Sequence, residues 1–474
     1  MTRHGDTAGG PAHEAGRWHL RGVRPLGGDP VDLLLDGGII AEAGRDLSVV
    51  GATVLDADGL VALPGLVDLH THLREPGRED AETVASGTRA AALGGFTTVF
   101  AMANTEPVAD TAGVVEQVWR LGRDAGYCDV RPVGAVTEGL RGVRLAELGA
   151  MASSAAAVRV FSDDGNCVSD AVLMRRALEY VKAFDGVIAQ HAQEPRLTED
   201  AQMNEGVVSA RLGLPGWPAA AEEAIIARDV LLAGHVGSRL HVCHVSTAGS
   251  VELLRWAKSK GWRVTAEVTP HHLLLTDDLA TSFDPVYKVN PPLRTAADVE
   301  ALRAGLADGT IDCVATDHAP HAPQDKETEW MAARPGMVGL ETALSIAIMT
   351  MLETGLLDWA GLADRMAIAP GRIGGLPGGS GAPAGGHHHP PAAGGRPSRA
   401  PAHDVHPAGA GALSLSAGAV ANLVLVDPVA RWTVDAGALA SRGRNTPYAG
   451  RKLPGRVQAT FLRGRPTVLD GKIV

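Results

Sequence analysis

Two histidines separated by one residue offer the clearest starting point for chemistry in this chain. His70 and His72 stand in the segment Leu66-Val-Asp-Leu-His-Thr-His-Leu-Arg-Glu-Pro-Gly77. On an extended strand, residues two apart point to the same face, so both imidazoles could bind one metal ion. The pattern is weak by itself, because a chain with 18 histidines contains about 0.7 such pairs by chance. His387 and His389 form another pair.

Further residues of metal-ligand type follow other short apolar segments. They are Asp163, Asp164, His191, His244, Asp317, His318 and His321. If these segments are the parallel strands of a TIM barrel, all these positions project into the mouth at its C-terminal face. Histidines and carboxylates that converge there suit a pair of borderline divalent ions such as zinc. A water between two such ions has its pKa lowered to about 7, which predicts metal-assisted hydrolysis of an amide-like bond.

Two neighbouring metal ions also need an anion from the protein between them. Some enzymes of this architecture use a carboxylated lysine, but the first lysine of this chain is Lys182, within a stretch of helical character. The bridge is therefore expected to be a carboxylate. Asp163 and Asp164 are both candidates.

Eight short segments have the composition of the strands that would position these residues. They alternate with alanine-rich stretches of helical character, a pattern typical of βαβ units and a parallel sheet. They lie at 66–69, 97–101, 130–136, 157–161, 186–189, 240–243, 263–268 and 312–315. Eight strand candidates within about 250 residues predict an α/β fold with a TIM (β/α)8 barrel. The candidate metal ligands make it a barrel of the metal-dependent hydrolase type.

The ends of the chain differ in pattern from the barrel segment, which we place at 64–376. Residues 17–63 and 416–474 contain strand-like runs and turns, and we expect them to pair in one small β-sandwich domain. Residues 1–16 are polar and glycine-rich, and residues 377–415 are dominated by Gly, Pro, Ala and Ser. Both are predicted to be disordered, the first as a tail and the second as a low-complexity insertion.

Composition and charge favour a protein that acts on small molecules. Hydrophobic residues make up 45% of the 474 residues, enough for a substantial core. The 43 Lys+Arg against 54 Asp+Glu give a net charge of −11, which disfavours nucleic acid and anionic membrane surfaces as partners. The four cysteines form no CxxC pair, and no apolar run has the length of a secretory signal or a membrane span. A cytoplasmic location is therefore predicted.

Six motifs occur in the order typical of one enzyme family. They are His70-Thr-His-Leu-Arg-Glu-Pro-Gly77, Met102-Ala-Asn-Thr105, Phe161-Ser-Asp-Asp-Gly165, His241-Val-Cys-His-Val-Ser-Thr247, Asn290-Pro-Pro-Leu-Arg294 and Ala315-Thr-Asp-His-Ala-Pro-His321. In these motifs the chain resembles the type I dihydroorotases of the amidohydrolase superfamily. The resemblance extends over residues 18–375 and 416–464, where Arg444-Asn-Thr-Pro-Tyr448 is similar to the Asn-Thr-Pro ending of that family.

The resemblance implies a role for each candidate residue. Two zinc ions per subunit would be bridged by Asp164 and hydroxide, with Asp164 preferred to Asp163 because its spacing to His191 matches the family. The implied metal ligands are His70, His72, Asp164, His191, His244 and Asp317. Asp317 would also be the catalytic residue that moves the proton. The implied substrate-binding residues are His72, Leu73, Arg74, Asn104, Asn290, His321, Pro335 and Gly336.

The function implied by the resemblance is that of a dihydroorotase in pyrimidine biosynthesis, the reversible zinc-dependent hydrolysis of (S)-dihydroorotate to N-carbamoyl-L-aspartate. The chemistry agrees, because an arginine fork with amide and imidazole groups suits the substrate carboxylate. Two alternatives are another cyclic amidohydrolase, such as a hydantoinase or allantoinase, and a catalytically silent partner of aspartate transcarbamoylase. Arg74 and the lack of a bridging lysine disfavour the first, and the complete ligand set disfavours the second. We also expect a homo-oligomer, and partnership of an active enzyme with aspartate transcarbamoylase stays open.

Overall fold

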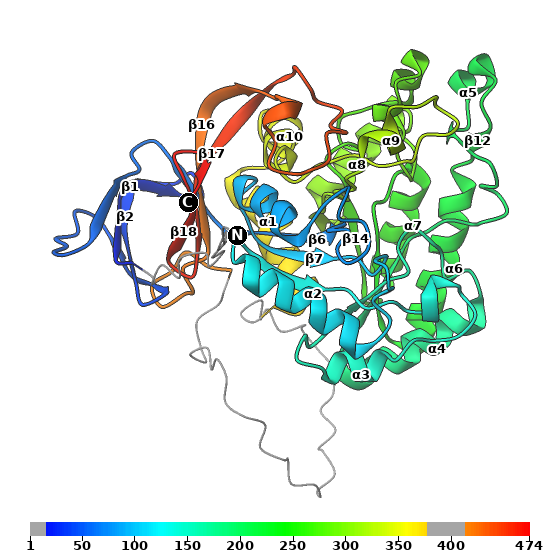
Figure 1. Cartoon of the computed structure of the whole chain (residues 1–474), viewed down its shortest axis with the longest axis horizontal. Helices are drawn as coiled ribbons and strands as arrows, with labels where there is room; N and C mark the ends of the chain where they lie inside the picture. The colour runs from blue at the N-terminus through cyan, green and yellow to red at the C-terminus, as the bar shows by residue number, and fades with distance from the viewer. Residues whose placement is uncertain (1–15, 377–412) are drawn as a thin grey trace, which may run out of the picture.

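The computed structural model describes residues 16–376 and 413–474. Figure 1 shows a helix-covered body next to a layer of strands in which both ends of the chain take part. The α/β fold expected from the sequence is confirmed. The predicted disordered tail and insertion lie, apart from residues 16 and 413–415, outside the described residues. No helix in the described ranges has the length and apolar character needed to cross a membrane.

Each of the eight predicted segments contains a strand. The strands are β6 (Leu66–Thr71), β7 (Phe96–Ala101), β8 (Asp129–Pro132), β9 (Val160–Phe161), β10 (Val187–Gln190), β13 (Arg239–Val242), β14 (Val264–Val268) and β15 (Cys313–Val314). They form two parallel sheets, ordered β6-β7-β8 and β15-β14-β13-β10-β9. Two single parallel bridges, Gly134 with Phe161 and Thr71 with His318, join the edges of these sheets.

Helices follow most of these strands and pack on the outside of the sheets (Figure 1). They are α1 (Val84–Leu93), α2 (Ala112–Ala125), α3 (Leu148–Ser153), α4 (Ala171–Val181), α6 (Ala220–Val236), α7 (Ala248–Ser259), α8 (Ala296–Asp308), α10 (Ala343–Ala347), α11 (Trp359–Ala363) and α12 (Ala369–Ile373). Three of them begin at threonine caps, Thr83, Thr247 and Thr295, whose hydroxyls accept the N–H three residues on. These caps fix where each loop at the strand ends turns into its helix.

Besides these two parallel sheets, a nine-stranded sheet, called the second sheet below, joins the two ends of the chain. It is built from β1 (Trp18–Pro25), β2 (Val31–Asp36), β3 (Ile39–Gly44), β4 (Thr53–Asp56), β5 (Val61–Pro64), β16 (Leu423–Thr433), β17 (Lys452–Leu462), β18 (Arg465–Leu469) and β19 (Lys472–Ile473). The antiparallel pairing of β5 with β16 connects the N-terminal strands to the C-terminal ones. Leu20, Leu33 and Phe461 are among the buried residues of its separate core. The connection between β16 and β17 runs back to the helix-covered body.

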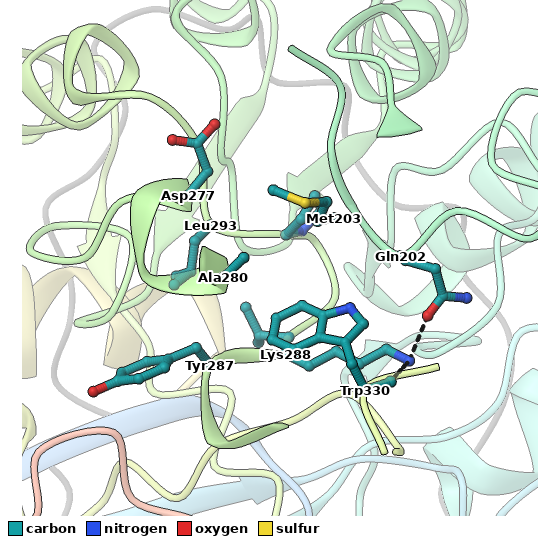
Figure 2. Close-up of a pocket in the computed structure, with 10 residues that line it drawn as sticks. Gln202, Met203, Asp277, Ala280, Tyr287, Lys288, Leu293 and Trp330 are labelled. Atoms are coloured by element: carbon teal, nitrogen blue, oxygen red, sulfur yellow. Dashed lines mark hydrogen bonds between the residues drawn. The ribbon is translucent and has the colours of Figure 1, made fainter. Parts of the chain in front are cut away.

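Short elements outside the main strands enclose a small cavity of about 10 Å³, shown in Figure 2. The lining elements are β11 (Met203–Asn204), η3 (Asp277–Ser282) and η4 (Pro285–Tyr287). Further short elements of the chain are α5 (Val207–Leu212), β12 (Gly216–Trp217) and α9 (Pro323–Lys326). Nζ of Lys288 donates hydrogen bonds to Oε1 of Gln202 (2.7 Å) and to the carbonyl of Trp330 (2.8 Å). A cavity of this size has room for about one water molecule, so it is excluded as a substrate site.

Candidate functional site

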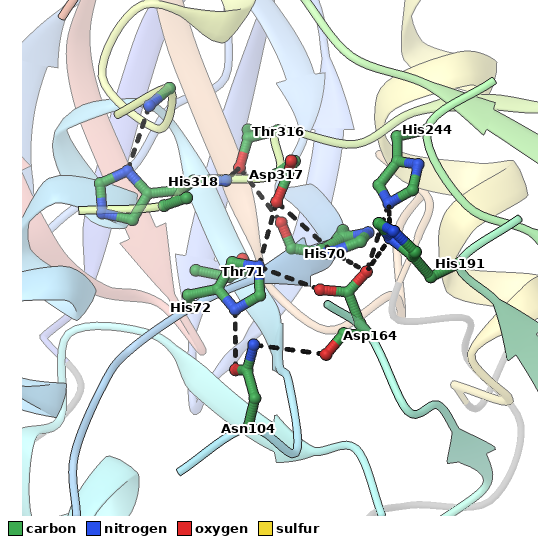
Figure 3. A network of polar contacts seen from close by, with 12 residues as sticks. His70, Thr71, His72, Asn104, Asp164, His191, His244, Thr316, Asp317 and His318 are labelled. Atoms are coloured by element: carbon green, nitrogen blue, oxygen red, sulfur yellow. Dashed lines mark hydrogen bonds and ion pairs between the residues drawn. The ribbon is translucent and has the colours of Figure 1, made fainter. Parts of the chain in front are cut away.

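The six predicted metal ligands meet beyond the C-terminal ends of five parallel strands (Figure 3). His70 lies on β6 and His72 directly after it, and the others follow β9, β10, β13 and β15. All six are buried, with at most 5% of each residue exposed: His70, His72, Asp164, His191, His244 and Asp317. Side chains from distant parts of the sequence are thus brought into one cluster at one edge of the strands.

The carboxylate of Asp164 lies at the centre of this cluster. Its Oδ1 atom is 3.2 Å from Nε2 of His70, from Nδ1 of His191 and from Nε2 of His244. Its Oδ2 atom is 3.3 Å from Nε2 of His72. Burial alone would raise the pKa of Asp164, but the charge of His70 and hydrogen bonds to the imidazoles hold that pKa well below its usual value. Asp164 is therefore placed to act as an anion shared by all four histidines.

The neighbouring Asp163 points elsewhere. Its Oδ1 atom accepts hydrogen bonds from the backbone N–H groups of Val136 (2.8 Å) and Thr137 (2.9 Å), and its Oδ2 atom accepts one from the Thr137 hydroxyl. These contacts fix the loop after β8. The geometry thus separates the two aspartates that the residue pattern alone left as alternatives, and it favours Asp164 as the bridge.

Asp317 completes the cluster from the end of β15. Its Oδ1 atom lies 3.0 Å from Nε2 of His72 and 3.5 Å from Nε2 of His70. The backbone is left-handed at Asp317 (φ 45°), His244 (φ 30°) and Arg74 (φ 60°). Such backbone is uncommon outside glycine and asparagine, and it persists where surrounding contacts hold a functional side chain in place.

Two features of the cluster fit a site for cations. Nε2 of His70 is buried and has no hydrogen-bond partner within the described part of the chain, and Nδ1 of His191 lies 2.9 Å from Nε2 of His244. Imidazole nitrogens and carboxylate oxygens gathered at such short distances are donor atoms that favour a cation. The donor atoms form two compact groups that share Asp164, one with His70, His72 and Asp317 and one with His191 and His244. The residues therefore form a candidate metal site.

Glu267 on β14 supports the cluster from behind, although the sequence analysis did not select it. This fully buried glutamate places Oε1 2.7 Å from Nδ1 of His70 and Oε2 3.0 Å from Nε2 of His241. Burial acts to raise the pKa of Glu267, but the charges of His70 and His241 and the hydrogen bonds to them together lower this pKa to about 2. A carboxylate on the far nitrogen of a ligand histidine fixes the tautomer and the orientation of the ring. A glutamate within the apolar strand Val264–Val268 is the signal that could have identified it.

Gln193 is a second residue that the sequence analysis did not select. Its Oε1 atom lies 2.7 Å from Nε2 of His191 and accepts a hydrogen bond from Nδ2 of Asn290 (3.3 Å). Its Nε2 atom donates to the hydroxyl of Thr198 (2.7 Å). An acceptor at this position places the His191 proton on Nε2 and leaves Nδ1 free to face Asp164. The glutamine thus connects the cluster to a predicted substrate-binding residue.

A cavity of about 210 Å³ opens directly beside the cluster. Seven of the eight predicted substrate-binding residues line it: His72, Arg74, Asn104, Asn290, His321, Pro335 and Gly336. Leu73 does not, because its side chain is only 2% exposed and packs against Gly87 in the hydrophobic core. Arg334, Gly165 and Ala319 also line the cavity and were not predicted.

Away from the carboxylates of Asp164 and Asp317, the cavity lining combines the positive charge of Arg74 with neutral hydrogen-bonding groups. Nε of Arg74 donates to the carbonyl of Pro320 (3.2 Å), and burial lowers the pKa of Arg74 to about 10, so the guanidinium stays charged at neutral pH. Burial and the charge of Arg74 lower the pKa of His321 to about 3, which leaves this imidazole neutral. Oδ1 of Asn104 lies 2.9 Å from Nδ1 of His72. The cavity therefore suits an anionic ligand placed next to the metal-type cluster.

Comparison with known proteins identifies the family. The Dihydro-orotase-like family matches residues 59–250. The dihydroorotase of Streptomyces coelicolor is 66% identical over 454 residues, which cover 96% of this chain and 99% of that protein. The chain belongs to the dihydroorotase family. The dihydroorotase of Mycobacterium tuberculosis is 55% identical over 96% of this chain and 99% of its own. These matches confirm the resemblance found in the sequence motifs.

Solved structures similar to this dihydroorotase-family chain include a hydantoinase and a dihydropyrimidinase. An L-hydantoinase (dihydropyrimidinase) from Arthrobacter aurescens superimposes with a TM-score of 0.79 at 23% identity, covering 97% of each chain. A dihydropyrimidinase from Brevibacillus agri gives a TM-score of 0.77 at 21% identity, covering 97% of this chain and 96% of that one. At this level of identity the likeness concerns the fold alone.

Replacing Glu267 with glutamine is expected to weaken metal binding by this dihydroorotase-family protein about 10- to 100-fold. The amide keeps the shape of the side chain but removes the negative charge that orients His70. Competition with a coloured chelator measures the affinity. Glu222→Gln is the matched control, because Glu222 is also buried but accepts hydrogen bonds from Ser246 and Ser250 and from no residue of the cluster. Equal affinity of wild type and Glu267→Gln would contradict the role.

Proposed function

We propose that this protein catalyses the reversible hydrolysis of dihydroorotate to N-carbamoyl-aspartate in pyrimidine biosynthesis. The observation that carries the proposal is a cavity that places the buried guanidinium of Arg74 next to the cluster around Asp164. A ring that carries a carboxylate would place its charge at Arg74 and its amide at the cluster. The relatives of 55% and 66% identity named dihydroorotase support the same activity.

The eight parallel strands are proposed to close into a (β/α)8 barrel over residues 64–376. The single bridges of Gly134 with Phe161 and of Thr71 with His318 support this closure, because they join the two sheets at both edges. The remaining strands at 17–63 and 416–474 would form the small β domain, as their pairing through β5 and β16 supports. In this arrangement the cluster occupies the mouth at the C-terminal ends of the strands.

The cluster is proposed to hold two zinc ions. His70, His72 and Asp317 would bind one, His191 and His244 the other, and Asp164 both. Imidazole nitrogens and carboxylate oxygens are the donors that zinc prefers at catalytic sites. When bound, the ions supply Lewis acidity toward the amide oxygen and lower the pKa of a water.

The residues of the chain itself have separate tasks in this proposal. Arg74, Asn104 and His321 would bind the substrate carboxylate, and Asn290, with Pro335 and Gly336, would position the ring. Asp317 would accept the proton of the attacking water and deliver it to the leaving ring nitrogen, since its carboxylate lies at the junction of cluster and cavity. In the reverse direction the same groups would close the ring.

The alternatives have less support. A hydantoinase or allantoinase acts on a ring without the carboxylate that Arg74 is placed to bind. A silent partner of aspartate transcarbamoylase would not need the complete donor set. Homo-oligomer formation, partnership with aspartate transcarbamoylase and a cytoplasmic location stay predictions from the sequence.

The proposal is tested with Arg74→Ala in the zinc-loaded protein. We expect KM for dihydroorotate to rise about 100-fold, because a charge-assisted pair is lost inside the cavity, while metal content stays unchanged. Arg120→Ala on the surface of α2 is the control and should match wild type. A wild-type protein that hydrolyses hydantoin or dihydrouracil faster than dihydroorotate would overturn the proposed function.

A further inference from the structure

We propose that Asn445 is a positioning residue for the substrate cavity and controls substrate affinity without touching the substrate. This inference rests on the proposed function. Asn445 lies outside the strands that carry the cluster, in the connection between β16 and β17 at residues 434–451. It is 6% exposed and does not line the cavity.

Asn445 binds the two chain segments that form one wall of the cavity. Its Oδ1 atom accepts a hydrogen bond from the backbone N–H of His321 (3.1 Å). Its Nδ2 atom donates to the carbonyl oxygens of Ala319 (2.9 Å) and Gly336 (3.0 Å). Its own carbonyl accepts from the N–H of Val338 (3.1 Å). Three of these four partners line the cavity, so the amide sets the position of that wall.

The wall has little room to adjust by itself. Gly336 has a left-handed φ of 143°, and a Cβ atom there would lie 2.7 Å from Nε2 of His321 and 2.9 Å from Cβ of Ala319. Nε2 of His321 also donates to the carbonyl of Pro335 (2.8 Å). The two segments are thus in direct contact, and a shift of either one moves the imidazole and the backbone that face the substrate.

An asparagine is the side chain that fits these partners. One acceptor and two donors are needed at short range, which an amide provides and neither a carboxylate nor an apolar group does. The 326–336 segment is also held by hydrogen bonds that do not involve Asn445. Nζ of Lys326 donates to the carbonyl of Arg334 (2.9 Å), and the N–H of Gly336 donates to the carbonyl of Lys288 (2.9 Å). Loss of the Asn445 amide should therefore loosen one edge of the wall and leave the segment folded.

The connection that carries Asn445 is itself fixed to the helix-covered body. Glu82 accepts hydrogen bonds from the N–H of Arg442 (3.1 Å) and from the hydroxyl of Ser441. Glu341 accepts one from the N–H of Ala440 (2.9 Å), and Tyr448 is buried in a core cluster. The connection between β16 and β17 is therefore a fixed support for this wall of the cavity.

Steady-state kinetics of Asn445→Asp and Asn445→Ala in the zinc-loaded protein test the inference. We expect KM for dihydroorotate to rise about 10- to 30-fold in both variants, with kcat within about threefold of wild type. Asn445→Asp loses the hydrogen bonds that the amide nitrogen donates, and Asn445→Ala loses all those of the side chain. Bound zinc should stay equal to wild type. Equilibrium binding of N-carbamoyl-aspartate, measured by calorimetry, should weaken by the same factor as KM rises.

Two control variants separate positioning from a general loss of stability. Arg442→Ala changes an exposed side chain in the same connection. Ser345→Ala removes a buried hydroxyl that donates to the carbonyl of Gly455 (3.0 Å), in contact with the second sheet but not with the cavity. Both should keep the wild-type KM, even where Ser345→Ala lowers the melting temperature.

Each outcome has one meaning. A wild-type KM in both Asn445 variants, or an equal rise of KM in Ser345→Ala, overturns the positioning role while wild type still hydrolyses dihydroorotate. A wild-type protein that binds zinc but does not hydrolyse dihydroorotate overturns the proposed function instead. Loss of zinc in the Asn445 variants would also contradict the inference, because the effect would then pass through the cluster.

Discussion

Asp164→Asn is expected to lose about half or more of the bound zinc and to reduce the rate of dihydroorotate hydrolysis about 1,000-fold or more. The reason is the position of this carboxylate, whose two oxygens lie 3.2–3.3 Å from nitrogens of all four cluster histidines. Asparagine has nearly the same shape but no negative charge to share between two cations. Metal analysis of the purified protein and a spectrophotometric assay measure the two effects.

The neighbouring aspartate supplies a matched control for this prediction. Asp163→Asn changes the same chemical group one residue away, where the carboxylate accepts hydrogen bonds from Val136 and Thr137. We expect it to retain zinc and to lower the free energy of unfolding by about 1–3 kcal/mol, because a buried contact is weakened. Retention of zinc by Asp164→Asn together with its loss in Asp163→Asn would reverse the assignment of the bridge.

The strand pattern of the sequence predicted the His/Asp cluster because each candidate ligand stands at or shortly after the end of an apolar strand segment. The strand boundaries were less predictable. The segment 157–161 contains a strand at Val160–Phe161 alone, since Ala157 has a left-handed backbone (φ 49°) that cannot belong to a strand. In the segment 130–136 the continuous strand ends at Pro132, which has no N–H to donate. Strand pairing resumes at Gly134.

Residues that support the cluster could not be predicted in the same way, because their partners are distant in the sequence. Glu267 contacts His70 across 197 positions, and Asn445 contacts His321 across 124. No spacing rule connects such pairs before the strands are assembled. Leu73 was implied as a substrate contact by the family resemblance; its side chain turns into the core, so any such contact stays a prediction for its backbone.

Asp317→Asn is expected to lower kcat about 1,000-fold while KM for dihydroorotate changes less than about threefold. The amide cannot take up the proton of the attacking water, but His70, His72 and Asp164 remain to hold the first metal. Bound zinc should therefore stay near the wild-type amount. Steady-state kinetics and metal analysis on the same preparation provide the measurement.

The control for this prediction is Asp277→Asn, which alters another buried aspartate whose partner is Nδ2 of Asn204 (2.8 Å), outside the substrate cavity. Its kcat should equal that of wild type. If Asp317→Asn lost zinc in proportion to activity, Asp317 would serve as a ligand without a separate part in proton transfer. A selective fall in kcat would instead assign proton transfer to Asp317. Its role would then differ from that of Asp164, whose substitution lowers bound zinc, and from that of Arg74, whose substitution raises KM.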